Sequence, residues 1–176
     1  MNPILKSIAT KHGLYLGLIL ALQTVIAYAI NVELFVNTLF GISIYILAVL
    51  VGIFAIYQTR KALNYVNFKE TFTAYFLTIL IGLAITTLVS FVLFNFIDTD
   101  AALLLKEKSV EKLIQVYKNI NMAPEKIDEM VTQIKSENLF SLKNSLSSLA
   151  VNYLLPLMII GLLISVVMKK SKPDTE

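Results

Sequence analysis

The chain has 176 residues, of which 57% are hydrophobic and 15% are charged, and its formal net charge is only +3. A soluble domain with so apolar a surface would aggregate, and the scattered lysines form no basic stripe that would bind nucleic acid. The chain contains no cysteine, which excludes disulfides and thiolate metal sites. The composition therefore predicts a protein whose first partner is membrane lipid.

Four stretches of the chain contain no charged residue, and each is long enough to cross a bilayer. A helix rises about 1.5 Å per residue and the hydrocarbon core is about 30 Å thick, so about 20 residues suffice. We therefore expect an all-α, polytopic membrane protein that forms a single membrane domain over residues 1–176. Its predicted transmembrane spans are residues 13–32, 34–59, 71–97 and 144–168.

The first span has some features of a cleaved signal peptide. Lys6 and Lys11 precede it, and Ala27-Tyr28-Ala29 near its end has the pattern of a cleavage site. The apolar run is long, however, and the second span begins at Leu34 almost without a gap. We therefore predict that the first span is retained and forms an antiparallel helical hairpin with the second.

Basic residues gather at the span ends that four crossings place on one side of the membrane. The positive-inside rule makes that side cytoplasmic, so both termini are predicted to be cytoplasmic. The polar insertion between the third and fourth spans, residues 98–143, is then extracytoplasmic, although its own lysines weaken the bias. The residues behind this prediction are Lys6, Lys11, Arg60, Lys61, Lys69, Lys169, Lys170 and Lys172.

Small side chains recur every four residues along the third span, which predicts a helix-packing seam. Helices in lipid associate through close backbone approach and interhelical hydrogen bonds, and small residues permit both. Gly13 and Gly17 form a shorter stripe in the first span. Such seams join the helices of one bundle or join two copies of the chain, and we favour the first. The third-span stripe consists of Ala74, Thr78, Gly82, Thr86 and Ser90.

Gln23 and Asn152 lie well inside the first and fourth spans, and we expect both to be buried. Amides in a bilayer usually bond across helices, although they can also line a substrate path. Pro156 frees the backbone carbonyl of Asn152, so a kink is expected in the fourth span. No Asp, Glu, Lys, Arg or His lies within a predicted span, which argues against a proton relay or an ion-coupled carrier.

The polar insertion has the spacing of two amphipathic helices. Its second half places Ile127, Met130, Val131 and Ile134 on one helix face. An apolar stripe must be buried, so the stripes of the two helices pack together, lie on the membrane surface or dock on a partner protein. Mutual packing is the simplest outcome, and partner docking by the four residues of the second stripe is the functional hypothesis.

No cluster of residues predicts an enzyme or a cofactor site. Asp98, Asp100 and Glu33 could meet at one membrane face and bind a divalent cation, but helix capping explains both aspartates without a metal. His12 is the only histidine, and beside Lys11 at the membrane surface we expect it to be solvated. Common phosphate-binding, dinucleotide-binding and hydrolase motifs are absent from the sequence. We expect no catalytic residue, metal or cofactor.

Two local stretches precede the third span, Arg60-Lys61 and then Asn-Phe-Lys-Glu-Thr-Phe at positions 67–72. Together with the order of spans, basic link and polar helical insertion, they resemble a bacterial integral-membrane family of unknown function, domain of unknown function family 4199. The resemblance covers nearly the whole chain. It implies a four-helix, multi-pass protein of the bacterial inner (plasma) membrane, and it implies no activity, cofactor or catalytic residue.

These features favour a non-enzymatic membrane subunit or scaffold that binds a partner through its insertion. The alternative is a small oligomeric transporter or channel lined by hydroxyl and amide side chains, with Gln23, Thr86 and Asn152 facing the path. The expected partners are membrane lipid together with another membrane protein or a second copy of the chain.

Overall fold

The computed structural model describes residues 1–170, and every regular element within them is helical, so the protein is all-α. Four helical stretches are long and apolar enough to cross a membrane: Pro3–Ile30, Thr38–Leu63, Phe68–Ile97 and Leu142–Met168. Short 3-10 (η1) and π (η2, η3) segments interrupt or join the α-helices. The elements are α1 (Pro3–Ile30), η1 (Val32–Val36), α2 (Thr38–Leu63), α3 (Phe68–Val92), η2 (Leu93–Ile97), α4 (Thr99–Asn119), α5 (Pro124–Ser136), α6 (Leu142–Ser148), η3 (Leu149–Leu154) and α7 (Leu155–Met168).

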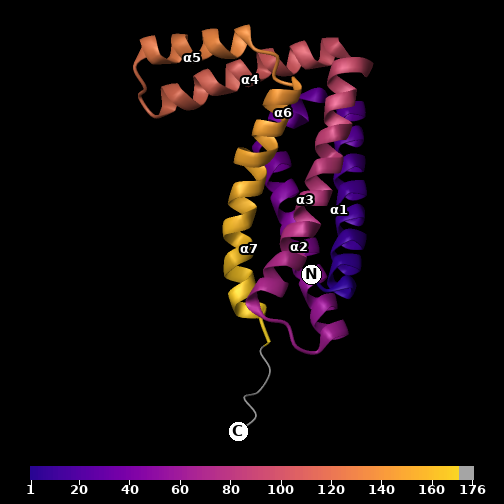
Figure 1. Ribbon diagram of the computed structural model, residues 1–176. Helices are drawn as coiled ribbons and strands as arrows, with labels where there is room; N and C mark the ends of the chain where they lie inside the picture. The colour runs from indigo at the N-terminus through magenta and orange to yellow at the C-terminus, as the bar shows by residue number, and fades with distance from the viewer. Residues whose placement is uncertain (171–176) are drawn as a thin grey trace.

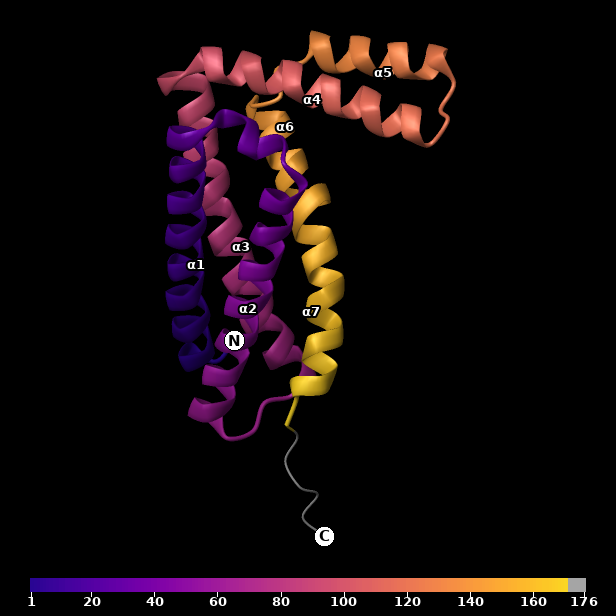
Figure 2. The same ribbon diagram turned by 180° about the vertical axis from the view of Figure 1, so that it is seen from behind.

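The four long helical stretches stand side by side as an antiparallel bundle, and α4 and α5 lie across one end of it (Figure 1). We call α4 and α5 together the hairpin, and this end of the bundle the hairpin end. α1 begins and α7 finishes at the opposite end, the terminal end, where Val66 and Lys170 exchange two backbone hydrogen bonds. The hairpin extends sideways beyond α7, as the reverse view also shows (Figure 2).

Asparagine side chains fix where two of the spans begin. The Asn37 side chain accepts a hydrogen bond from the Leu39 N–H at the start of α2. Asn67 accepts from the Glu70 N–H at the start of α3, while the Glu70 carboxylate accepts from the Asn67 N–H. The first N–H groups of a helix have no partner within it, so these caps satisfy them at the bundle ends.

Helices α1 and α3 approach closely because each offers glycine to a bulky side chain of the other. A Cβ atom added at any of the three glycines of this seam would lie 2.6 to 2.7 Å from a side-chain carbon of the facing helix. Close backbone approach of this kind is what holds helices together in lipid. The three contacts are Gly13 with Ile81, Gly17 with Ile85, and Gly82 with Leu16.

Helices α2, α3 and α7 meet around one aromatic side chain, Tyr75, which is 1% exposed. Its ring lies between Gly52 of α2 and Gly161 of α7, and a Cβ atom on these glycines would lie 2.5 and 2.4 Å from ring carbons. The Tyr75 hydroxyl is buried and has no hydrogen-bond partner among residues 1–170. The terminal half of the bundle is therefore tightly filled.

The stripe predicted along the third span divides between two environments. Ala74, Thr78 and Gly82 are buried, and the Thr78 hydroxyl donates to backbone carbonyls of both α1 and α3. Thr86 and Ser90 are half-buried and line a cavity, and their role in helix packing stays a prediction. Residues spaced by four advance about 40° around a helix at each step, so the stripe turns by about 160° over its length.

Within the hairpin, α5 packs its apolar stripe against α4. Ile127 is only 6% exposed, and Val131 and Ile134 are half-buried. Met130, in contrast, remains 37% exposed. The hairpin itself covers Ile127, and docking of the four residues on a partner stays a hypothesis.

The single histidine, His12, is buried, whereas the sequence predicted that it is solvated. His12 is 9% exposed, its Nδ1 atom lies 2.8 Å from the Ile8 carbonyl oxygen, and its ring contacts the edges of Tyr15 and Phe54. It is therefore a buried residue, not a solvated one. Position 12 shares a face of α1 with the buried residue Leu16, and this helical periodicity outweighs the charged neighbour at position 11.

Candidate ligand-binding cavity

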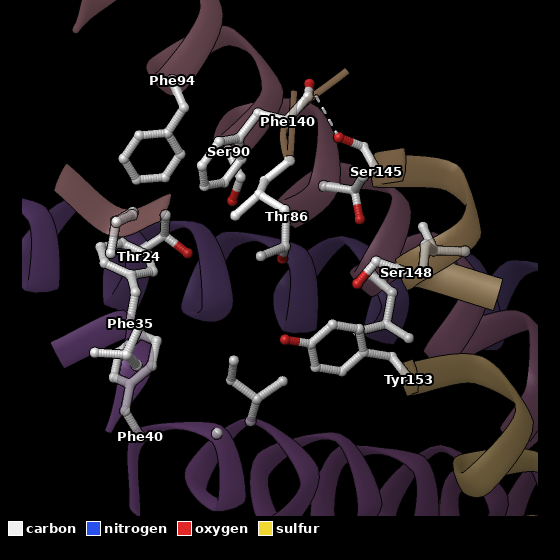
Figure 3. Close-up of a pocket in the computed structure, with 18 of the residues that line it drawn as sticks. Thr24, Phe35, Phe40, Thr86, Ser90, Phe94, Phe140, Ser145, Ser148 and Tyr153 are labelled. Atoms are coloured by element: carbon white, nitrogen blue, oxygen red, sulfur yellow. Dashed lines mark hydrogen bonds between the residues drawn. The ribbon is translucent and has the colours of Figure 1, made fainter. Parts of the chain in front are cut away.

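A cavity of about 240 Å³ lies inside the bundle at the hairpin end. Helices α1, α2, α3 and α6 and the π segments η2 and η3 contribute its walls, and α4 covers it with Leu105 and Ser109. Figure 3 shows these side chains arranged around the space. The residues around Tyr75 do not belong to the lining, so the cavity ends before the tightly filled terminal half of the bundle.

The polar part of the lining consists of hydroxyl groups. The Tyr153 hydroxyl points into the cavity, and Thr86 and Ser90 line the cavity from α3 (Figure 3). The Thr24 and Thr86 hydroxyls donate to carbonyls of their own helices at 2.9 and 3.0 Å, which leaves lone pairs on both oxygens to accept from a ligand. The hydroxyl-bearing residues of the lining are Thr24, Thr86, Thr87, Ser90, Ser109, Ser145, Ser148 and Tyr153.

Phenylalanine rings form the wall of the cavity nearest the hairpin. The ring centroids of Phe94 and Phe140 are 4.3 Å apart, and Phe35 lies 5.3 Å from both Phe94 and Phe40. Aromatic pairs with offset or edge-to-face geometry stabilise one another beyond the area that they bury. The cavity therefore combines a rigid apolar wall with a set of neutral hydrogen-bonding groups.

Two π segments border the cavity, and proline accounts for part of this geometry. Pro156 occupies the first turn of α7, directly after the π segment η3. Its ring leaves the carbonyl of Asn152 without its usual partner, and the Tyr45 hydroxyl of α2 donates to that carbonyl. The Tyr45 ring also stacks on Tyr153 at 5.8 Å, which holds the Tyr153 side chain in place. π turns are frequent at functional sites.

The two amides predicted to be buried have separate roles. Gln23 joins α1 to α2 by donating to the Ser43 hydroxyl at 2.6 Å, and it does not line the cavity. Asn152 is exposed on the outside of the bundle, where it donates to Ser148 at 3.1 Å. The prediction that Asn152 is buried is therefore wrong, because the neighbouring Tyr153 takes the inward position in the π turn.

In the part of the chain that the structure describes, no carboxylate, amine or imidazole belongs to the cavity lining, and nearby charges form other contacts. Asp98 accepts from the Ala101 N–H at 2.8 Å and from the Tyr28 hydroxyl at 2.7 Å, and these bonds hold the pKa of Asp98 below its ordinary value. Glu33 pairs with Lys108 at 3.3 Å. Across residues 1–170, no cluster of three or more His, Cys, Asp or Glu side chains could hold a metal ion.

The sequence placed Gln23, Thr86 and Asn152 on a ligand path, and of these only Thr86 lines the cavity. It did not identify Tyr153, Ser145 or Ser148 as lining residues. A signal for the missed residues was present, because Ser145 and Ser148 share one helix face, as do Thr86 and Ser90. The phenylalanines gave no such signal, since aromatic residues are common throughout the spans.

Four apolar helical stretches around an uncharged internal cavity define a helical, multi-pass membrane protein. The chain belongs to the family described as Protein of unknown function (DUF4199), whose model matches residues 11–170. Comparisons with curated proteins and with solved structures found no match. Family membership brings no activity, so function has to be argued from the cavity.

Proposed function

We propose that this protein is a non-enzymatic membrane protein that binds one small, uncharged, amphipathic molecule in the cavity at the hairpin end. The observation that carries the proposal is the lining, in which eight hydroxyl-bearing residues from five helical elements surround an otherwise apolar space, and no charged residue of the described chain belongs to it. Small-molecule sites typically combine apolar walls with a few placed polar groups. Hydroxyls both donate and accept, so alcohols, ketones and esters fit this chemistry.

The packing of the terminal half supports a binding site over an open channel. Tyr75 fills the space between Gly52 and Gly161, so a solute in the cavity would meet a closed seam before the terminal end. Conduction through one copy of the chain would require three helices to separate. Binding requires only the space that is already present, and a transport cycle would start from the same bound state.

The proposal is tested by filling the cavity. Ser90→Leu replaces a lining hydroxyl with a larger apolar side chain, and Ala84→Leu adds the same side chain on the exposed face of α3. Each protein is purified in mild detergent, extracted with organic solvent and examined for bound molecules by mass spectrometry. We expect the wild type and Ala84→Leu to carry a stoichiometric uncharged molecule, and Ser90→Leu to lose it by about tenfold, the effect of roughly 1.4 kcal/mol. Equal amounts in all three proteins would contradict the proposal.

A second function, recognition of a partner membrane protein, is supported by the hairpin. The hairpin projects beyond the bundle, and Met130 and Val116 on it are 37% and 47% exposed. We expect Met130→Glu to release a stoichiometric partner in native mass spectrometry, whereas Thr132→Glu, on an exposed neighbouring position, should not. Retention of the partner by Met130→Glu would argue against this role.

We further propose that the hairpin is extracytoplasmic and that both ends of the chain are cytoplasmic, in a bacterial inner membrane. The lysines and arginine at the terminal end support this orientation through the positive-inside rule. The chain has no cysteine, so a thiol reagent would label only the cysteine that a substitution introduces. An impermeant thiol reagent should label Lys126→Cys and not Lys61→Cys in intact cells. The reverse pattern would invert the topology.

A further inference from the structure

A groove of about 620 Å³ opens on the outside of the bundle where α4 crosses the start of α2. One wall is a face of α2 that includes Gly41, Ile42 and Tyr45, and the other is the side of α4 that includes Lys112 and Val116. The α2 face continues along a helix that is long and apolar enough to span the membrane. The groove therefore joins the membrane surface to the acyl region.

Among the described residues, Lys112 is the one cationic residue of the groove lining. Its ammonium group donates to two neutral acceptors, the Val36 carbonyl and the Thr38 hydroxyl, the latter at 3.0 Å. Within residues 1–170 it forms no ion pair, whereas Lys108, one turn earlier on α4, pairs with Glu33 and Glu111. An ammonium has three N–H donors, so Lys112 retains one donor and an uncompensated positive charge.

Gly41 marks the apolar part of the groove as open space. At the other five glycines an added Cβ atom would come within 2.7 Å of a facing side chain, but at Gly41 it would meet nothing within 4 Å. Gly41 is therefore not a packing glycine. It leaves room beside Ile42 and Tyr45 for a chain of methylene groups.

We propose that this groove binds a phospholipid, with its phosphate on Lys112 and one acyl chain along α2 past Gly41. An uncompensated ammonium at the head of an apolar groove complements an anionic phosphodiester attached to hydrocarbon. A free phosphate ion would leave the apolar part empty, and a neutral lipid would leave the charge unmet. The site goes beyond the proposed cavity ligand, because Lys112 does not line the cavity.

The groove and the cavity nevertheless share a wall. Phe35, Val36, Gly41 and Ser109 line both spaces. A lipid in the groove therefore lies directly beside the molecule in the cavity, and the two sites can be tested in the same protein. Ser90 lines the cavity alone, and Lys112 lines the groove alone, so the two proposals fail independently.

The test is native mass spectrometry of the full chain in mild detergent with added phosphatidylglycerol. Lys112→Gln removes the charge, and Lys118→Gln makes the same change on an exposed position of α4. We expect the wild type, Lys118→Gln and Lys112→Arg to retain one bound lipid, and Lys112→Gln to bind it about tenfold more weakly, as the loss of a charged hydrogen bond predicts. Equal binding by the two glutamine variants would overturn the proposal.

A second variant separates lipid binding from attachment of the hairpin, because Lys112 also ties α4 to η1 and α2. Gly41→Leu keeps the charge and adds a bulky side chain to the wall that the groove shares with the cavity, so it should also release the lipid, while Gly41→Ala should retain it. Undiminished binding by Gly41→Leu would contradict the proposed acyl position. Diacylglycerol, which lacks phosphate, should bind weakly and equally to the wild type and Lys112→Gln. Displacement of phosphatidylglycerol by inorganic phosphate would show that the site takes the free ion.

Discussion

Replacing Gly82 with alanine tests the packing that joins α1 to α3. The new Cβ atom would lie 2.6 Å from both Cγ and Cδ2 of Leu16, and 2.9 Å from its Cβ. Carbon atoms in contact are normally about 3.5 to 4.0 Å apart, so one helix would have to move by about 1 Å. Leu16 is 0% exposed and belongs to the main core cluster, which leaves it little room to adjust.

The expected loss follows from two opposing effects. Overpacking of a filled core typically costs about 1–3 kcal/mol. Alanine favours a helix over glycine by about 1 kcal/mol, which offsets part of that cost. We therefore expect Gly82→Ala to lower the free energy of unfolding by about 0–2 kcal/mol, and Gly82→Leu to lower it further, because the larger side chain extends deeper into α1.

The assay is reversible unfolding in mixed detergent micelles, followed by far-ultraviolet circular dichroism. Gly41→Ala is the matched control, since its Cβ meets nothing within 4 Å and its stability should be unchanged or slightly higher. In a Leu16→Ala background the clash is absent, so Gly82→Ala should cost less there by about 1 kcal/mol or more. Equal unfolding midpoints for Gly82→Ala and Gly41→Ala would refute the reasoning.

The remaining predictions concern polar groups. The pKa of Asp98 is lowered by the Ala101 N–H and the Tyr28 hydroxyl, so its stabilising effect is present above the unfolded-state pKa of about 4 and is lost as the pH falls through the folded value. Asp98→Asn should therefore flatten the dependence of stability on pH below about 4, and an unaltered acid transition would contradict this. Tyr45→Phe leaves the Asn152 carbonyl without its side-chain donor and should cost about 0.6–1.7 kcal/mol in the same unfolding assay, whereas no change would indicate that another group replaces the hydroxyl.

Hydropathy predicted four apolar stretches that overlap the four long helical stretches of the structure, but it did not predict where those helices begin and end. The first span was predicted to begin at residue 13, whereas α1 begins at Pro3, with Asn2 as its cap. The charges of Lys6 and Lys11 limit how much of the chain enters lipid, but they do not prevent the backbone from being helical. The two amphipathic helices of the insertion followed from spacing alone, and Asp98 caps the first of them as expected.

The cavity could not be predicted in the same way, because it depends on where helices fail to touch. Gly41 and Gly52 are both glycines within the second span, yet one faces open space and the other faces the Tyr75 ring. Only the tertiary arrangement separates them. The third-span stripe shows the same limit, since a spacing of four identified small residues but not the partner that each one faces. Periodicity shows which residues share one face of a helix. A site also depends on how several helices are rotated relative to one another, and the spacing within one helix does not determine that.

The position of Tyr75 has a consequence for the order in which the bundle is assembled. The first three spans leave the ribosome before α7, and the glycine contacts between α1 and α3 need nothing from the last helix. Before α7 packs, Gly52 covers one edge of the Tyr75 ring, and the opposite edge, which Gly161 contacts in the bundle, is uncovered. The latest of the four described spans, α7, therefore completes the enclosure of a side chain from the third span. Burial of Tyr75 therefore depends on a helix that lies about 90 residues later in the chain.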